Sequence, residues 1–135
     1  MTSRKGFTLI ELMVVIFIVG ILAAVAIPIM RGRIDAAKWS EGKAAMGSIR
    51  TACRAFQAEK GASYADYGTT TLTQLGLAPD DLDGKYFTNG CYVLTDFTPT
   101  TYTITCTAAT SGSTEKPTSP SVIVLDQTGT FTETP

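Results

Sequence analysis

The sequence contains no histidine, the side chain that enzymes use most often as a general base and that proteins use most often as a metal ligand. Ser-His-Asp and Cys-His catalytic sites therefore cannot be built from this chain alone. The 11 Lys and Arg residues nearly balance the 12 Asp and Glu residues, and the basic residues are scattered. The sequence therefore has no cluster of basic residues of the kind that binds nucleic acid. We predict a protein that is not an enzyme, needs no cofactor and binds no nucleic acid directly.

Charge is also scarce near the N-terminus. After a short basic leader, residues 1–6, the run from 7 to 30 contains one charged residue, Glu11. A helix of that length would extend about 36 Å, whereas about 20 apolar residues suffice to cross a membrane. The apolar core of a secretory signal is shorter, at about 7–15 residues. A buried core helix is the weaker alternative, because so small a domain can hardly cover it. We predict a membrane-spanning helix over residues 7–30.

The pattern after this run becomes amphipathic, which predicts one helix from about Phe7 to Lys60. Apolar residues recur at helical spacing, with charged residues largely between them. Pro28 and Gly32 weaken this helix without ending it, and two interpretations remain: the helix can unwind there, or it is simply kinked. Gly61 is the predicted stop. The apolar positions of the second half, residues 31–60, are Ile34, Ala37, Ala45, Ile49, Ala52, Cys53 and Phe56.

The rest of the chain, residues 61–135, is rich in Thr, Gly, Ser and Asp and predicts a β-rich head. Four segments hold alternating β-branched and aromatic residues, the pattern of strands joined by turns. We expect an α+β fold, in which an antiparallel sheet of three or four strands packs on the amphipathic half of the long helix. The four segments are residues 85–95, 100–108, 122–125 and 129–132.

Two features stand between the long helix and the predicted sheet. Thr71 and Gln74 have the spacing of a capping box, which predicts a short helix over residues 72–77. The acidic residues Asp80, Asp81 and Asp83 follow in a turn-rich loop. They are weak candidates for calcium, but their spacing falls short of an EF-hand loop. A solvated acidic turn is the favoured interpretation, and we predict no metal site.

The chain has three cysteines, Cys53, Cys91 and Cys106. If the first two predicted strands pair across their turn, Cys91 and Cys106 come opposite each other or nearly so. We predict that these two form a disulfide, which would add roughly 3 kcal/mol of stability outside the cytoplasm. Disulfides that include Cys53 are the alternatives to this pair. Cys53 lies on the apolar helix face, however, and we favour its interpretation as a small buried hydrophobic residue. None of the spacings matches a zinc site.

The residues Arg4-Lys5-Gly6-Phe7-Thr8-Leu9-Ile10-Glu11-Leu12 resemble the processing site of type IV prepilins and type II secretion pseudopilins. The resemblance implies that a membrane peptidase cuts between Gly6 and Phe7 and that the new terminus of Phe7 is N-methylated. Glu11 would become the fifth mature residue, and Pro28 falls where the family has its helix-kinking proline. The motif covers roughly the first 30 residues, whereas the remainder matches the family in layout.

Glu11 supports the same interpretation on physical grounds. A carboxylate well inside a membrane span costs roughly 2.5–3.5 kcal/mol, so it needs a partner. Cleavage after Gly6 would create a positive amine on Phe7, four residues from Glu11. The amine of a neighbouring subunit could pair with this carboxylate and set the stagger between subunits, as is thought to happen in the family. The competing interpretation is a glutamate near the membrane interface that reaches for water.

Three functions follow from these observations. The favoured one is a type IV pilus subunit, held in the inner membrane as a precursor and then assembled with copies of itself into a surface filament for adhesion, twitching motility or DNA uptake. The implied partners are a prepilin peptidase and methyltransferase and the inner-membrane assembly machinery. The first alternative is a pseudopilin of a type II secretion system. The second is an anchored binding domain that never polymerises, which would need neither Glu11 nor the Gly6–Phe7 junction.

Overall fold

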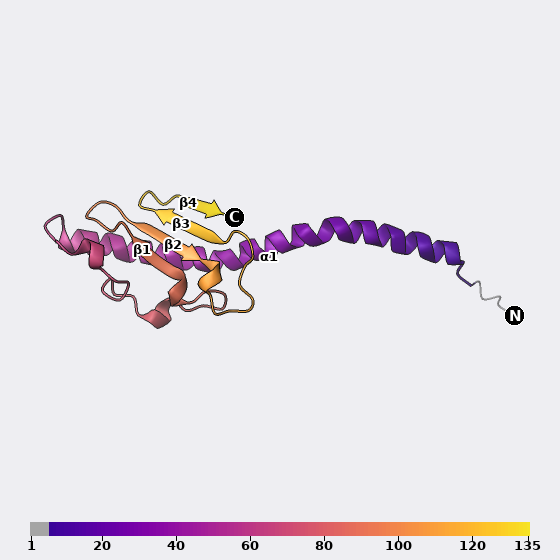
Figure 1. The fold of residues 1–135 in the computed structure, drawn as a ribbon, viewed down its shortest axis with the longest axis horizontal. Helices are drawn as coiled ribbons and strands as arrows, with labels where there is room; N and C mark the ends of the chain where they lie inside the picture. The colour runs from indigo at the N-terminus through magenta and orange to yellow at the C-terminus, as the bar shows by residue number, and fades with distance from the viewer. Residues whose placement is uncertain (1–5) are drawn as a thin grey trace. The chain divides into compact units, whose positions relative to one another are not determined.

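The computed structural model describes residues 6–135, and its first element is one long helix, α1 (Leu9–Lys60) (Figure 1). α1 begins two residues after the predicted start, because Thr8 caps it, and it continues through Pro28 as predicted. Gly61 follows its end with a φ of 65°, a backbone conformation that glycine adopts easily. The chain divides into two compact units, one up to Arg33 and the other from Ile34 to Pro135.

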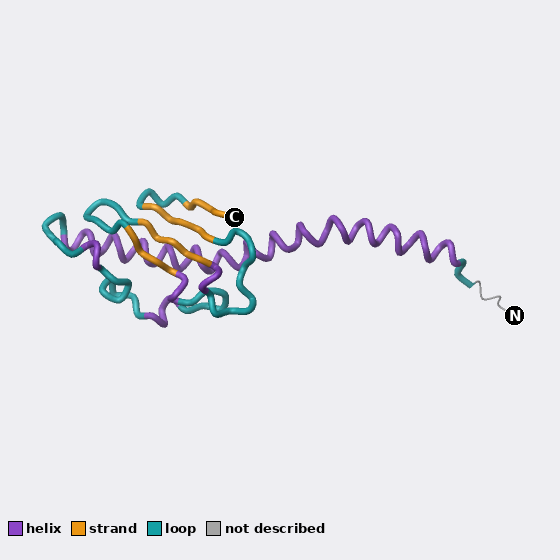
Figure 2. Tube along the Cα trace, in the orientation of Figure 1, coloured by secondary structure: helices purple, strands orange, loops and turns teal. Residues whose placement is uncertain are grey.

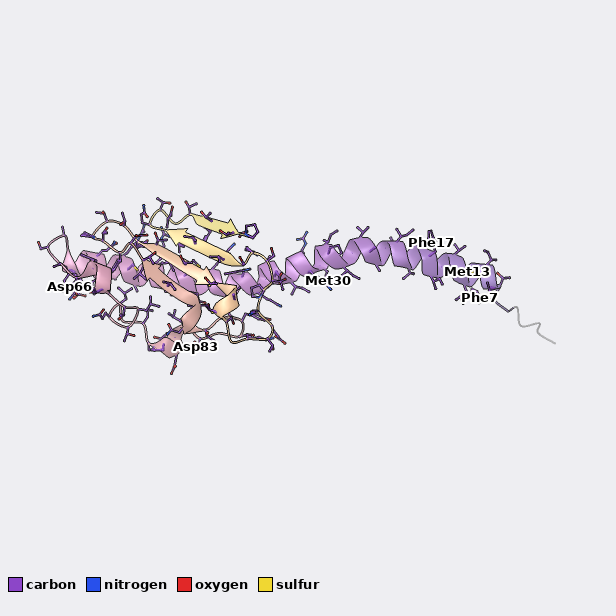
Figure 3. All side chains as sticks on the ribbon, viewed as in Figure 1. Phe7, Met13, Phe17, Met30, Asp66 and Asp83 are labelled. Atoms are coloured by element: carbon purple, nitrogen blue, oxygen red, sulfur yellow. The ribbon has the colours of Figure 1, made fainter. Side chains whose placement is uncertain are left out.

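Beyond Thr8, the described part of the first unit is helix with exposed apolar side chains. Figure 3 shows Phe7, Met13, Phe17 and Met30 projecting from it, and Phe17 is 69% exposed. Among residues 6–135, α1 is the one helix that is long and apolar enough to cross a membrane, by length and composition. This surface fits anchoring of a precursor in a membrane.

The second unit contains a four-stranded antiparallel sheet beside the second half of α1 (Figures 1 and 2). The strand order is β1-β2-β3-β4, so each strand pairs with its neighbour in sequence. The predicted α+β class, with a long helix packed against three or four antiparallel strands, is confirmed. The strands are β1 (Tyr92–Thr95), β2 (Thr103–Thr107), β3 (Val122–Asp126) and β4 (Phe131–Thr134).

The core lies between the sheet and one face of α1. The two central strands, β2 and β3, alternate in burial, so that residues such as Ile104 and Leu125 point inward while their neighbours point outward. Two positions predicted for the buried helix face are wrong: Ile34 is 46% exposed and Ala37 is exposed. The buried face instead starts at a polar residue, because Asp35 finds partners in a distant loop. Its members are Asp35, Trp39, Gly42, Met46, Ile49, Cys53 and Phe56.

Several predicted boundaries differ from the observed ones, and three of the differences have a local reason. β1 starts at Tyr92 rather than at residue 85, because the backbone N–H groups of residues 85–87 donate to Glu41 instead of to a strand. β4 starts at Phe131, because Gly129 has a φ of 94° and belongs to the turn. The helix expected over residues 72–77 is a single turn, which ends at Gly76 with a φ of 85°.

Glu41 ties the loop before β1 to α1. Its carboxylate accepts hydrogen bonds from the backbone N–H groups of Lys85 (3.1 Å), Tyr86 (2.8 Å) and Phe87 (3.0 Å). The ring of Phe87 in turn packs against Trp39 in a tilted arrangement, with centroids 4.7 Å apart. Gly84 lies so close to Glu41 that a Cβ atom there would collide with its carboxylate. The loop therefore depends on a helix carboxylate and on a glycine that lets it approach.

Asp35 ties the loop before β3 to the same helix. Its Oδ2 atom accepts hydrogen bonds from the Thr118 backbone N–H (3.2 Å), the Thr118 hydroxyl (2.6 Å) and the Ser119 backbone N–H (3.1 Å). One turn further on, the Trp39 indole donates to the Pro120 carbonyl at 3.0 Å. Burial alone would raise the pKa of Asp35, but these hydrogen bonds and the charge of Lys38 lower it more, so its pKa lies below the ordinary value.

The Gly84→Ala substitution is expected to lower the free energy of unfolding by about 1–3 kcal/mol, because the new methyl group would displace Glu41 from its hydrogen bonds. Denaturant unfolding of the full chain in detergent, followed by the fluorescence of its one tryptophan, Trp39, measures the change. Gly90→Ala is the matched control, since a Cβ atom there meets nothing within 4 Å. Equal losses in the two variants would contradict the role given to Gly84.

The Asp35→Asn substitution is expected to lower the free energy of unfolding by about 1–3 kcal/mol at neutral pH, because the charged acceptor is lost. The pKa of Asp35 is depressed in the folded state, so its contribution is present above its ordinary pKa of 3.8 and disappears as pH falls through the lower folded pKa. The difference between wild type and variant should therefore shrink in acid.

Unfolding curves from neutral pH down to acid, recorded for both proteins, measure this difference. Asp66→Asn serves as the control, because Asp66 is exposed. A loss that is the same at every pH, or the same in both variants, would count against this role of Asp35.

Candidate functional site

The Gly6–Phe7 junction lies in an exposed segment just before α1. Phe7 is 87% exposed, and a Cβ atom at Gly6 would meet nothing within 4 Å. Neither residue is helical, since α1 begins at Leu9. A protease needs exposed backbone outside regular structure, and this junction is exposed and not helical. The other leader residues, 1–5, lie outside the described residues.

Thr8 and Glu11 form a reciprocal capping box at the start of α1. The Glu11 carboxylate accepts hydrogen bonds from the Thr8 backbone N–H (2.9 Å) and the Thr8 hydroxyl (2.7 Å), and the Glu11 N–H donates to the Thr8 hydroxyl oxygen (3.3 Å). These bonds satisfy donors that every helix leaves free at its N-terminus, and the carboxylate also favours the positive end of the helix dipole. Glu11 is thus held beside Phe7, the residue that would carry the new amine.

Thr8 was not singled out from the sequence, although its signal is present. The spacing Thr8-x-x-Glu11 is the signature of a capping box, the same signature that we applied to Thr71 and Gln74. The contacts of that second box do form: Gln74 accepts from the Thr71 N–H at 2.8 Å, although only one turn follows. The capping-box spacing therefore predicts the local hydrogen bonds more reliably than it predicts that a long helix follows.

Pro28 and Gly32 both lie inside α1. A Cβ atom at Gly32 would meet nothing within 4 Å, so no close contact among the described residues requires glycine there. Proline removes one helical hydrogen bond, and glycine lowers the local preference for helix. The helix is therefore locally weakened over these residues. The alternatives of unwinding and kinking both stay predictions.

The three cysteines are buried free thiols in the structure, so the predicted Cys91–Cys106 disulfide is not formed there. The register pairs Tyr92 with Cys106, which places Cys91 next to the predicted position. Cys91 ends a 3-10 turn, and its Sγ atom accepts from the Thr88 N–H at 3.4 Å, so the sulfur contacts its own turn. Burial raises the pKa of Cys53 to about 12, in keeping with a small buried hydrophobe.

The acidic loop uses its carboxylates internally. Asp81 accepts from the Ala78 N–H at 2.9 Å, and Asp83 accepts from the Asn89 N–H at 2.7 Å. Within residues 6–135, no group of three or more Cys, Asp or Glu side chains could hold a metal ion. Asp80, Asp81 and Asp83 thus gain no support as calcium ligands, and the local geometry is that of a hydrogen-bonded turn.

Comparison with known proteins extends these observations. Residues 1–27 match the model of the prokaryotic N-terminal methylation motif. The chain is 42% identical over 77 residues to the type IV major pilin protein PilA of Myxococcus xanthus, covering 57% of this chain and 33% of that one. It is 40% identical over 89 residues to the type IV major pilin protein PilE1 of Neisseria gonorrhoeae, covering 63% and 50%. A fimbrial protein of Moraxella nonliquefaciens is 38% identical over 86 residues, covering 64% and 53%.

The chain therefore spans one third to about half of the length of these relatives. No solved structure matches it. The methylation motif and the relatives, which are named as pilins and fimbrial proteins, make this chain similar to structural subunits of pili rather than to enzymes. Within that class, they support the type IV pilin family, and the predicted family resemblance is confirmed.

Proposed function

We propose that this chain is the structural subunit of a type IV pilus, cut between Gly6 and Phe7 and N-methylated on Phe7. The observation that carries the proposal is the arrangement at the N-terminus: an exposed junction precedes a capped helix whose apolar residues up to Met30 are bare. Residues 7–30 then form the membrane and filament-core segment, residues 31–60 the half that supports the head, and residues 61–135 the head. Relatives named as major pilins favour this function over the pseudopilin.

Assembly uses the charge that cleavage creates. The amine of Phe7 would lie close to the Glu11 carboxylate, which Thr8 already holds at the start of α1. In the filament, this carboxylate forms an ion pair with the amine of a neighbouring copy. The pair neutralises two charges in an apolar environment, where the attraction between them is strong. The pair fixes the stagger between copies. Pro28 and Gly32 supply a weak point at which the helix unwinds or kinks as copies pack.

These steps imply an order of processing, assembly and display. A prepilin peptidase and methyltransferase process it in the inner membrane, and the assembly machinery there moves it into a filament of identical copies. The bare apolar segment then exchanges lipid for neighbouring helices, so that its exposed surface is buried again. The finished filament stands on the cell surface, where it would serve adhesion, twitching motility or DNA uptake.

The intact mass of the chain in filaments sheared from its source cells tests the processing. We expect a dominant species that lacks Met1–Gly6 and carries one added methyl group. Loss of two hydrogens, and alkylation of one thiol rather than three before reduction, would report one disulfide. Alkylation located on Cys53 by peptide mapping would assign that disulfide to Cys91 and Cys106. An uncut chain in the filaments would overturn the proposal. A cut chain found only in membranes would favour the pseudopilin instead.

The Glu11→Ala substitution tests the charge pair. We expect the precursor to enter the membrane normally, while the yield of filaments falls at least about tenfold, because the amine of each added copy loses its partner. Immunoblots of membranes and of sheared filaments measure the two quantities. Glu59→Ala is the matched control, since the Glu59 side chain is 69% exposed at the other end of α1. Normal filaments from Glu11→Ala would refute the pairing mechanism and leave the pilin assignment intact.

A further inference from the structure

The chain contains one asparagine, Asn89, and a glycine, Gly90, follows it directly. The two residues open the 3-10 turn Asn89–Cys91, which leads into β1 near Asp83, labelled in Figure 3. Gly90 is exposed and Asn89 is half-buried. Within residues 6–135, the Asn89 backbone N–H donates to the Asp83 carboxylate at 2.7 Å, whereas neither the Asn89 side-chain amide nor the Gly90 N–H is hydrogen-bonded. Two groups that react with each other are therefore left free.

Asparagine is one of the thermolabile residues of proteins, because its side chain can react with the next backbone nitrogen. Here the Gly90 nitrogen attacks the Asn89 Cγ atom, so that an N–Cγ bond forms while the Cγ–Nδ2 bond breaks. Nδ2 takes the proton of the Gly90 N–H and leaves as ammonia, which closes a succinimide ring. Water then opens the ring at Cγ to give aspartate, or at the main-chain carbonyl carbon to give isoaspartate. Nothing is oxidised or reduced, and water replaces ammonia.

The glycine at position 90 makes this attack easier. Glycine has no Cβ atom to shield its nitrogen, and its backbone has more conformational freedom than that of any other residue. A Cβ atom built at Gly90 would meet nothing within 4 Å, so the surrounding chain leaves room beside the attacking nitrogen. Both the sequence and the local packing therefore favour formation of the ring at this position.

A second dipeptide, Asp83–Gly84, could form the same ring with loss of water, but the fold restrains it. The Gly84 N–H donates to the Phe87 carbonyl at 2.8 Å, so the attacking nitrogen is already bonded. A Cβ atom at Gly84 would collide with the Glu41 carboxylate, so this glycine has no free space beside it. The structure thus holds one ring-forming dipeptide in place and leaves the dipeptide at Asn89 open.

The 3-10 turn sets the rate of the reaction in the folded chain. The Cys91 N–H donates to the Thr88 carbonyl at 2.9 Å, and the Tyr92 N–H donates to the Asn89 carbonyl. Attack requires the Gly90 nitrogen to rotate toward Cγ, which interrupts these bonds. A single 3-10 turn has poor hydrogen-bond geometry, and exposed segments open at a lower free energy than the core does. The folded chain is therefore expected to react more slowly than the unfolded chain, but still to react.

We propose that Asn89 is a self-deamidation site, at which the head of this chain converts a neutral amide into a carboxylate without a partner enzyme. The inference goes beyond the pilus function and does not depend on it. The new charge stands beside Asp83, and like charges repel. Isoaspartate also inserts the Cβ atom of residue 89 into the backbone, close to Cys91, which is fully buried. The chain therefore gains negative charge and loses the geometry of this turn as it ages.

Peptide mapping of the folded full chain in detergent, sampled during incubation at mildly alkaline pH, tests the site. We expect the peptide that contains Asn89 to gain the mass of water minus that of ammonia and to separate into two forms, with Asn89→Asp as the standard for aspartate. Gly90→Ala should slow the conversion at least about tenfold, because the methyl group shields the nitrogen and restricts the backbone. Gly112→Ala is the matched control and should convert like the wild type, since Gly112 is also exposed and a Cβ atom there meets nothing within 4 Å.

The wild type denatured in urea gives the rate without the turn, and the fluorescence of Trp39 identifies any variant that unfolds. Two results would overturn the inference. One is a folded wild type in which Asn89 stays unchanged while the denatured chain converts completely. The other is an equal rate in the folded wild type and in folded Gly90→Ala. If Gly90→Ala unfolds, the comparison of folded and denatured wild type decides alone.

Discussion

The sheet packs onto α1 through Trp39, Met46, Ile49 and Cys53, and the second unit depends on this burial. These side chains are at most 1% exposed. Four short strands alone cannot bury enough apolar surface to be stable, so they need a helix beneath them. α1 supplies that surface over its second half, whereas its first half is exposed and needs lipid or other helices. The two halves of α1 are therefore suited to different surroundings, and the composition of the helix changes from apolar to amphipathic between them.

Carboxylates on α1 place the loops around this core. Glu41 and Asp35 each accept backbone N–H groups from a segment that has no strand partner. Buried backbone donors must be satisfied, and the helix satisfies them where the sheet does not. Glu11 has the same chemistry at the N-terminus, since it accepts the N–H of Thr8. In each case a helix carboxylate fixes irregular backbone, and only Glu11 is expected to exchange that partner for another.

The sequence predicted elements that depend on local pattern. The long helix, the four strands and the class of the fold follow from apolar periodicity. The roles of Asp35 and Glu41 were not predicted, because their hydrogen-bond partners are remote in sequence. Asp35 binds residues 83 and 84 positions away, and Glu41 binds residues 44–46 positions away. The same contacts explain why residue 85 is not in a strand. At the candidate site, the motif marked Gly6, Phe7 and Glu11, whereas Thr8 was overlooked although its capping signature is local.

The loop between Ser111 and Thr118 has a consequence for how this head can change. The Ser111 hydroxyl donates a hydrogen bond to the Tyr86 carbonyl at 2.5 Å, and the Thr118 hydroxyl donates one to the Asp35 carboxylate. Both ends of the loop are therefore held in place. Gly112 and Thr114, between these pins, are exposed. Changes in length there are absorbed without reaching the core. The segment is thus a natural graft point, where an epitope or an affinity tag can be displayed while the rest of the head keeps its shape.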